Sequence, residues 1–401
     1  MPAAVPRVVL PAKATGGALI FAAILIVALN LRVAVTSIGP LLDEIRAGLH
    51  LSVAVAGLVT TLPTIAFAGV GALTPWLVRR FAPARVLVVA MLALGAGQLL
   101  RVMTDSAAVF IATSALALAG IAVANIMLPM LVKQYFPHRA GLVTGAYTTA
   151  LTIGTTVAAA SAVPIAHALG SWRAGLGVWA VLAVGAVLLW LPAALRARHA
   201  TRSATIAVRI RPGRTRLGRA MALYFGLQSL SGYAVMGWLA QLFRDAGYRP
   251  QTAGLLLAGV TAVGVPVALA MPAMATRLRT LRPLVLVMSA ASAASYVGLA
   301  VAPHSGAVLW VLLLAIGQGA FPLILSTIGL RARTAAGTVA LSGFAQSTGY
   351  VIAAFGPLLV GLLYEATGGW TLPIGFLLLA LAGQTLAGLA ISRPRYIEDE
   401  R

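Results

Sequence analysis

One arginine lies deep inside an apolar segment, where a charge is energetically unfavourable unless polar groups surround it. Arg32 follows a long apolar run and lies about 4 Å past the middle of the segment 17–42, at a helical rise of 1.5 Å per residue. A guanidinium in hydrocarbon costs roughly 2.5–3.5 kcal/mol on insertion scales, so it must face a polar interior. Arginine suits the planar, two-point recognition of anions. Arg32 is therefore a candidate anion-binding residue; the alternative is a structural arginine bonded to carbonyl or amide groups.

The acidic residues all lie outside the apolar runs, so none of them is an obvious partner for Arg32. Five lie in short connections and three in the C-terminal tail: Asp43, Glu44, Asp105, Asp245 and Glu365, then Glu398, Asp399 and Glu400. A carboxylate inside a membrane segment commonly relays protons or attracts cations. The sequence offers no such group, which favours an anion as the counter-charge of Arg32.

Other polar side chains are expected to line the same interior. Asn30 and Thr36 lie within one helical turn of Arg32. Tyr224 shares a helix face with Gln228, and Gln346 with Tyr350, by i, i+4 spacing. Asn125, Tyr147 and Gln318 interrupt otherwise apolar runs. Each could instead join two helices, since interhelical hydrogen bonds contribute about 0.6 kcal/mol on average. Arg101 lies three or four residues from the end of its run and is expected to extend outward to the interface.

The composition requires that these residues be carried by membrane-spanning helices. Of 401 residues, 60% are apolar and 9% are charged, against about 25% charged in soluble domains. A spanning helix needs about 20 apolar residues. Twelve runs qualify, near 17–42, 52–78, 84–104, 107–132, 140–168, 173–192, 218–243, 251–275, 283–302, 305–330, 338–363 and 370–392. The fold class predicted is an all-α integral membrane protein.

The basic residues predict how these helices are oriented. The net charge is +21, and 23 of the 29 lysines and arginines fall on one side of the twelve spans, with four on the other. Basic connections stay in the cytoplasm, so we expect a multi-pass protein of the cytoplasmic membrane with both termini inside. This placement explains the basic excess without nucleic acid. The polar stretch 193–217 is expected to be a cytoplasmic linker that also contacts anionic lipid head groups.

The two halves of the chain repeat each other. A shift of 197 superimposes the segment 56–58 on 253–255 and Arg80 on Arg277, and a shift of 198 superimposes Gly170 on Gly368. Six spans restore the starting side, so the repeats are parallel. The predicted organisation is an N-terminal six-helix half (1–192), the linker (193–217) and a C-terminal six-helix half (218–401). Two parallel six-helix repeats with a substrate site between them describe the major facilitator architecture.

Several segments resemble the cyanate and 2-nitroimidazole transporter (CynX/NimT) group of the major facilitator superfamily. They are 31–42 (LRVAVTSIGPLL), 57–63 (GLVTTLP), 128–137 (LPMLVKQYFP), 341–350 (LSGFAQSTGY) and 356–361 (GPLLVG). The loop 75–85 fits the superfamily motif G-x-L-x-D-R-x-G-R-R only in part, because Arg79 replaces the aspartate. The resemblance implies a twelve-span secondary carrier for a small molecule, such as a monovalent anion or a compact heteroaromatic compound.

Two functional hypotheses remain from the sequence. The first is a secondary transporter that moves a small organic or inorganic anion by alternating access, with Arg32 as the charge anchor. The second is an exporter of neutral, nitroimidazole-like compounds, in which Tyr224, Tyr233 and Trp238 matter more than charge. With five histidines and no cysteine, no metal or nucleophile cluster supports an enzyme. We expect no cofactor and a monomer, and leave open proton coupling through the substrate or His167.

Overall fold

The computed structural model describes residues 14–136, 139–196 and 211–400, and the regular elements in these ranges are helices. The long helices are α1 (Ala14–Thr36), α3 (Val53–Arg80), α4 (Pro83–Val102), α5 (Ala107–Tyr135), α6 (Ala140–Ala168), α8 (Ala180–Arg196), α9 (Arg216–Asp245), α10 (Pro250–Arg277), α11 (Arg282–Val301), α12 (Ala307–Gln318), α13 (Ala320–Leu330), α14 (Ala335–Thr367) and α15 (Thr371–Ile391). Shorter pieces are η1 (Gly39–Leu41), α2 (Leu42–Leu49), α7 (Trp172–Gly177), η3 (Pro212–Arg214) and η4 (Ile397–Asp399).

The described helices are long and apolar enough to cross a membrane. Eleven segments meet this condition by length and hydropathy. Helix α9 is a twelfth long helix, with 30 residues, that packs against α14 and α15. It falls outside the eleven because it combines charged residues at both ends with polar residues such as Gln228 and Gln241 along its length. The all-α membrane fold predicted from the sequence is confirmed.

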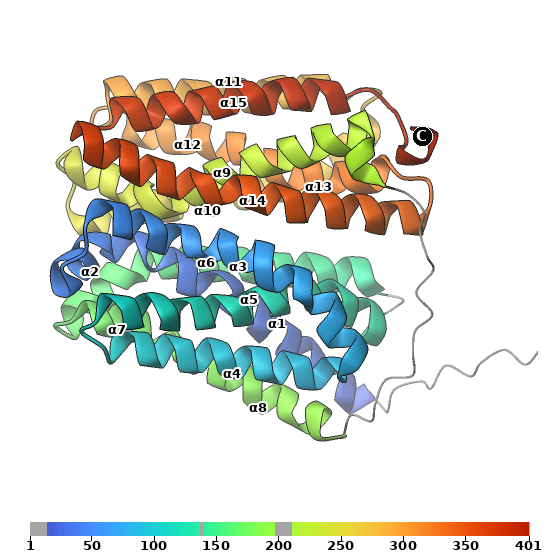
Figure 1. Cartoon of the computed structure of the whole chain (residues 1–401), viewed down its shortest axis with the longest axis horizontal. Helices are drawn as coiled ribbons and strands as arrows, with labels where there is room; N and C mark the ends of the chain where they lie inside the picture. The colour runs from blue at the N-terminus through green and yellow to red at the C-terminus, as the bar shows by residue number, and fades with distance from the viewer. Residues whose placement is uncertain (1–13, 137–138, 197–210, 401) are drawn as a thin grey trace, which may run out of the picture.

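The helices form two layers, and four helices make most of the contacts between them. Figure 1 shows α9 to α15 in the upper part of the molecule and α1 to α8 in the lower part. Across the junction α3 packs against α14, and α6 packs against α10. The boundaries 192 and 218 between predicted halves stay a prediction, and most of the linker 193–217 lies outside the described residues.

The internal repeat has a structural counterpart. Helices α3 and α10 each have 28 residues and begin 197 positions apart. Gly170 and Gly368 follow α6 and α14, with φ of 66° and 65°. This left-handed conformation strains side chains other than glycine. The same residue thus ends the same turn in both repeats. We call the end of the bundle that holds these turns the outer end, and the end at Arg80 and Arg277 the inner end.

The first predicted span, 17–42, is not one continuous helix. Helix α1 ends at Thr36, and η1 and α2 follow as separate elements. Gly39 allows a close approach to α9, because a Cβ there would lie 2.4 Å from the Met236 carbonyl oxygen. Pro40 lacks an amide hydrogen and cannot continue the helical ladder. The sixth and tenth spans are likewise divided, into α7 with α8 and α12 with α13.

Arg101 does not extend to the interface, so that prediction is wrong. Its side chain is fully buried between α4 and α1, and Nη1 donates to the Ala34 carbonyl oxygen at 3.3 Å. Ala34 lies in the last turn of α1, where carbonyl groups lack helical partners and the helix dipole favours a cation. The nearness of Arg101 to its helix end suggested snorkelling, but the face that carries it packs against another helix.

Candidate functional site

Arg32 lies where α1 meets α9. The side chain is partly exposed, and Nη1 donates to the Tyr233 hydroxyl oxygen at 3.1 Å. Its Cζ atom lies 5.5 Å from the centre of the Tyr233 ring, within cation–π range. The ion pairs in the described part of the chain involve other arginines, at positions 46, 173, 244 and 333. Arg32 is therefore held by a neutral hydroxyl and an aromatic face, which leave its positive charge uncompensated.

Aromatic rings continue from Tyr233 across the junction. Phe67 stacks on Tyr350, with ring centres 5.1 Å apart and planes at 22°. Tyr233 meets Tyr350 edge-on at 6.5 Å, and Phe225 meets Tyr350 edge-on at 5.2 Å. We call Arg32, Phe67, Phe225, Tyr233 and Tyr350 the central cluster. Offset and edge-on pairs of this kind stabilise a fixed arrangement beyond their buried area.

The central cluster draws on both halves of the molecule at one depth. Arg32 and Phe67 come from α1 and α3, while Tyr233 and Tyr350 come from α9 and α14. Phe67 and Tyr350 each lie near the middle of their helices. A cation and flat apolar rings at the midpoint of the bundle can hold a small planar or anionic molecule by charge and stacking.

Three amides form a separate network within the C-terminal helices. Gln228 donates from Nε2 to the Gln318 Oε1 atom at 2.7 Å, and its own Oε1 accepts from Gln384 Nε2 at 2.8 Å. Gln228 is only 3% exposed. Its amide is satisfied by neighbours on α12 and α15, so in this arrangement it joins helices. Gln384 was not among the predicted residues, although a single glutamine in the apolar run 371–391 is a usable signal.

Several other predicted residues pack or hydrogen-bond within the helices and do not contact the central cluster. Asn30 donates from Nδ2 to the Ile26 carbonyl, Thr36 donates from Oγ1 to the Arg32 carbonyl, and both are fully buried. Tyr224 is buried against Gly388 of α15. The helical spacing around Arg32 places Asn30 on a different face of α1, which accounts for its inward packing.

The remaining predicted residues are accessible but are not joined to Arg32. Asn125 on α5 and Tyr147 on α6 are partly exposed. Gln346 is also partly exposed, and its Nε2 donates to the Ser342 hydroxyl oxygen at 2.7 Å within α14. Of the ten residues predicted to bind substrate, only Arg32 and Tyr350 share the central cluster. Phe67 and Phe225 were not predicted, because an aromatic residue in a membrane helix carries no positional signal in a single sequence.

Contacts between the two layers close the outer end of the bundle. Arg244 of α9 pairs with Asp43 at 3.3 Å and Glu44 at 2.9 Å, and donates to the Pro40 carbonyl oxygen at 3.2 Å. Glu365 Oε2 accepts from the Ala54 amide at 3.0 Å. At the inner end, the side-chain hydrogen bonds between helices in the described ranges stay within one layer, as in the donation from Arg85 Nε to the Ala194 carbonyl.

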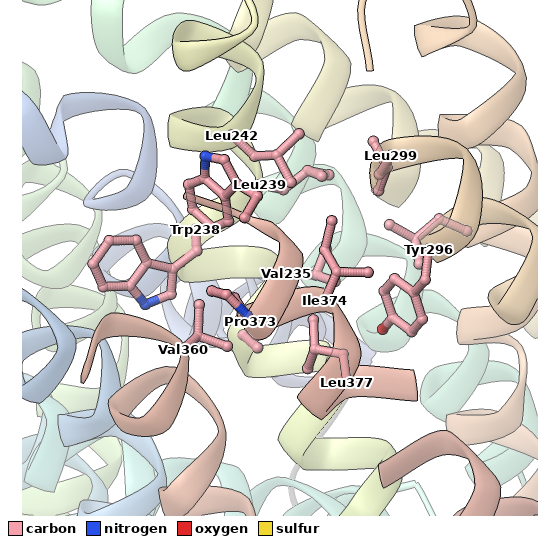
Figure 2. Close-up of a pocket in the computed structure, with 13 residues that line it drawn as sticks. Val235, Trp238, Leu239, Leu242, Tyr296, Leu299, Val360, Pro373, Ile374 and Leu377 are labelled. Carbon is pink, nitrogen blue, oxygen red and sulfur yellow. The ribbon is translucent and has the colours of Figure 1, made fainter. Parts of the chain in front are cut away.

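A small apolar cavity lies between the C-terminal helices, apart from the central cluster. Its volume is about 30 Å³, and Figure 2 shows Val235, Trp238, Tyr296, Ile374 and Leu377 among its walls. This volume would hold a water molecule, which needs polar partners that these walls do not supply. Trp238 donates from Nε1 to the Pro357 carbonyl at 3.0 Å. Trp238 therefore acts in packing, outside the central cluster.

Two sets of transmembrane helices, closed together at one end, with an arginine and aromatic residues at their junction, are typical of a secondary transporter of the alternating-access type. Residues 20–354 match the family model of the Major Facilitator Superfamily. The chain belongs to this superfamily, in the group related to the 2-nitroimidazole and cyanate transporters, and it is a transporter rather than an enzyme.

The chain is similar over nearly its whole length to curated bacterial proteins. It is 36% identical to the 2-nitroimidazole transporter of Escherichia coli (strain K12), covering 94% of this chain and 96% of the relative. It is 29% identical to the cyanate transport protein CynX of the same organism, covering 93% and 97%. The inward-open xylose transporter XylE of E. coli has the same fold, with a TM-score of 0.73, 13% identity and coverage of 93% and 94%.

Proposed function

We propose that this transporter moves a small organic or inorganic anion across the cytoplasmic membrane, with Arg32 as the charge anchor. The observation that carries the proposal is the partly exposed guanidinium of Arg32 at the helix junction, bonded to the neutral Tyr233 hydroxyl. A charge in a membrane interior requires compensation. An anionic substrate would supply it at each binding event, and would accept hydrogen bonds from the other guanidinium nitrogens.

The aromatic members of the central cluster would select substrates by their shape. Phe67, Tyr233 and Tyr350 contact one another, and the Tyr233 ring lies against Arg32. A flat or rod-shaped anion would lie against these rings while the guanidinium holds its charge. The cyanate named for one relative is small and anionic, which supports this chemistry.

A second candidate is the export of neutral nitroimidazole-like compounds. The stacked pair Phe67–Tyr350 favours it, as does the substrate named for the relative that is 36% identical. In that case stacking would provide most of the affinity, and Arg32 would donate a hydrogen bond to a nitro or ring acceptor. Loss of the charge would then reduce affinity only a few-fold.

Substitution of Arg32 separates the two candidates. Purified protein in liposomes is first screened for ligand-induced thermal stabilisation with cyanate, other small anions and 2-nitroimidazole, since ligands stabilise the state they bind. Uptake of the ligand found is then measured in wild type, Arg32→Gln and Arg32→Lys. A charge-assisted hydrogen bond contributes about 1.5–3 kcal/mol, so we expect Arg32→Gln to weaken anion affinity by about 10- to 150-fold. Arg32→Lys should recover part of it.

The matched control is Arg173→Gln, which removes an arginine paired with Asp105 at the outer end. Anion uptake in this variant should equal that of wild type. Saturable anion uptake that is the same in Arg32→Gln and wild type would refute the role of Arg32. A preference for 2-nitroimidazole that survives the substitution would support the second candidate.

Coupling and assembly are part of the same proposal. We infer that the protein works as a monomer. Any proton coupled to transport moves either with the substrate or through His167. His167 Nδ1 lies 2.8 Å from Gln251 Nε2 at the outer ends of α6 and α10. Uptake measured with and without a pH gradient in wild type and His167→Gln tests this. A pH-gradient effect that persists in His167→Gln would assign the coupling to the substrate.

A further inference from the structure

The inner end of the C-terminal layer contains a basic cavity that is separate from the central cluster. It has a volume of about 620 Å³ and lies between the start of α9, the start of α11 and the end of α15. Four arginines line it, Arg216, Arg282, Arg393 and Arg395, together with one acid, Glu400. From its walls we propose that this cavity binds the head group of an anionic phospholipid of the inner membrane leaflet.

The charge of the cavity is suited to a phosphate group. All four arginine side chains are exposed, and the ion pairs of the described residues involve arginines at other positions. Glu400 offsets one of these four charges, and its Oε2 accepts from the Leu217 amide at 2.9 Å, so the cavity keeps a net positive charge. Arginine forms two-point hydrogen bonds with phosphate oxygens. Several guanidinium groups around one hollow therefore favour a phosphate-bearing ligand.

One helix N-terminus adds to the positive potential. Helix α11 begins at Arg282 on the cavity wall, whereas the first turn of α9 is already bonded to Glu400. The amino end of a helix carries a partial positive charge and favours anions. The wall is held in place by Ser392, whose carbonyl oxygen accepts from the Leu281 amide at 3.3 Å. The arginines thus surround a framework of fixed backbone.

An apolar surface that continues from the cavity toward the membrane favours a lipid over a free phosphate. Leu389 and Ala390 belong to the wall. One helical turn further into the bilayer, Leu223, Leu286 and Leu386 are 41%, 41% and 70% exposed. Residues three or four positions apart share a helix face, so these leucines extend the faces of Ala220, Arg282 and Ala390. Acyl chains would lie along them while the head group occupies the cavity. Basic pockets between helices on the cytoplasmic side are suited to such head groups.

The test compares two double variants of equal charge. Arg393→Gln/Arg395→Gln removes two cavity arginines, and Arg277→Gln/Arg279→Gln removes two exposed arginines of the inner end outside the cavity. Binding of phosphatidylglycerol and cardiolipin to the purified full-length protein is measured by native mass spectrometry and by thermal stabilisation, with phosphatidylcholine as reference. Each arginine near an anionic surface contributes about 1 kcal/mol. We therefore expect the cavity variant to bind anionic lipid about 25-fold more weakly, and the control to stay within about twofold of wild type.

Further arms of the test distinguish a lipid from a soluble anion. Inorganic phosphate at the same concentration should give no stabilisation, and Leu386→Gln should weaken lipid binding without loss of the fold. Equal loss in both double variants would show a general basic surface and overturn the proposal. Stabilisation by inorganic phosphate as large as by lipid would overturn it in favour of a soluble anion. If the double variant does not fold, Arg395→Gln alone provides the comparison, and lipid affinity equal to wild type in that variant also overturns the proposal.

Discussion

At the scale of single residues, Arg32 is paired with a phenol instead of a carboxylate. A carboxylate partner would neutralise the guanidinium and remove its attraction for an anion. The Tyr233 hydroxyl instead orients the side chain through one hydrogen bond at 3.1 Å and keeps the charge available. The Tyr233 ring also supports the cation from one side. Tyr233 thus orients the side chain of Arg32, while the guanidinium charge itself would attract the anion.

Substitution of Tyr233 separates the contribution of its hydroxyl group to anion affinity from that of its ring. Tyr233→Phe removes a hydrogen bond but keeps the packing against Phe67 and Tyr350, so anion affinity should fall by about tenfold or less. Tyr233→Ala also removes the aromatic face and should reduce affinity further. Binding is measured by the thermal shift of the ligand found in the screen. A larger loss in Tyr233→Phe than in Tyr233→Ala would contradict this division of roles.

At the scale of elements, the outer end of α9 clamps the first six helices. The Arg244 side chain is 16% exposed and reaches Asp43 and Glu44 on α2. Its partners belong to the segment that follows the break in α1. The outer end can open only if these contacts separate. They therefore contribute to the free-energy difference between outward-closed and outward-open states.

We expect Arg244→Gln to increase opening at the outer end. The chain contains no cysteine, so Thr60→Cys can be added as a reporter; Thr60 is 6% exposed and faces Gly237 of α9. Ion pairs near the surface contribute about 0.2–1 kcal/mol, so labelling from outside by an impermeant maleimide should be about 1.4- to fivefold faster. The control is Arg46→Gln, whose ion pair with Asp43 stays within α2. Identical labelling rates in the Arg244→Gln and parent proteins would rule out the clamp.

The C-terminal tail caps another element, α14. Glu398 accepts hydrogen bonds from the Arg333 and Thr334 amides, just before α14 begins. Partial burial acts to raise the pKa of Glu398, but these hydrogen bonds outweigh it and hold the pKa below its ordinary value of 4.5. Because the folded-state pKa is depressed, the contact stabilises the fold at neutral pH and is lost as the pH falls through that lowered pKa.

This linkage gives a pH-dependent difference between wild type and Glu398→Gln. At pH 7 the variant should have the lower midpoint of thermal unfolding, and the difference should shrink as the pH is lowered toward 3. The comparison is made in one detergent across a series of buffers. A difference of constant size from pH 7 to pH 3 would mean that the Glu398 charge does not stabilise the tail.

At the scale of the whole molecule, the distribution of arginines predicts which end of the bundle faces the cytoplasm. The inner end holds Arg80, Arg277 and the basic cavity, whereas the acidic residues near Arg244 lie at the outer end. We expect green fluorescent protein fused after the C-terminus to fluoresce, and alkaline phosphatase fused after Gly247 to be active. The reverse pattern would invert the topology, and with it the leaflet assigned to the lipid site.

Much of the fold could be predicted from the sequence because the bilayer imposes a simple rule. Runs of about 20 apolar residues must be helices, since backbone groups in lipid have no other partners. The repeat at a shift of 197 has a counterpart in α3 and α10, which have equal lengths and begin 197 positions apart. The broken helices could not be predicted in this way, because hydropathy averaged over a window does not detect a break such as that at Gly39.

The sequence by itself predicted a membrane transporter with an arginine, Arg32, deep in its first span and no acidic residue within the spans. Charge and apolarity are properties of individual residues, and the bilayer sorts them without regard to packing. Only the tertiary structure decided which groups meet that cation. Tyr233 is 201 positions away, and Phe67 stacks on Tyr350 across the junction. It also decided that Gln228 bonds to Gln318 and Gln384, and that Arg101 is buried against α1. Which face of a helix turns toward which neighbour depends on shape complementarity among many side chains, and a single sequence does not contain that information in local form.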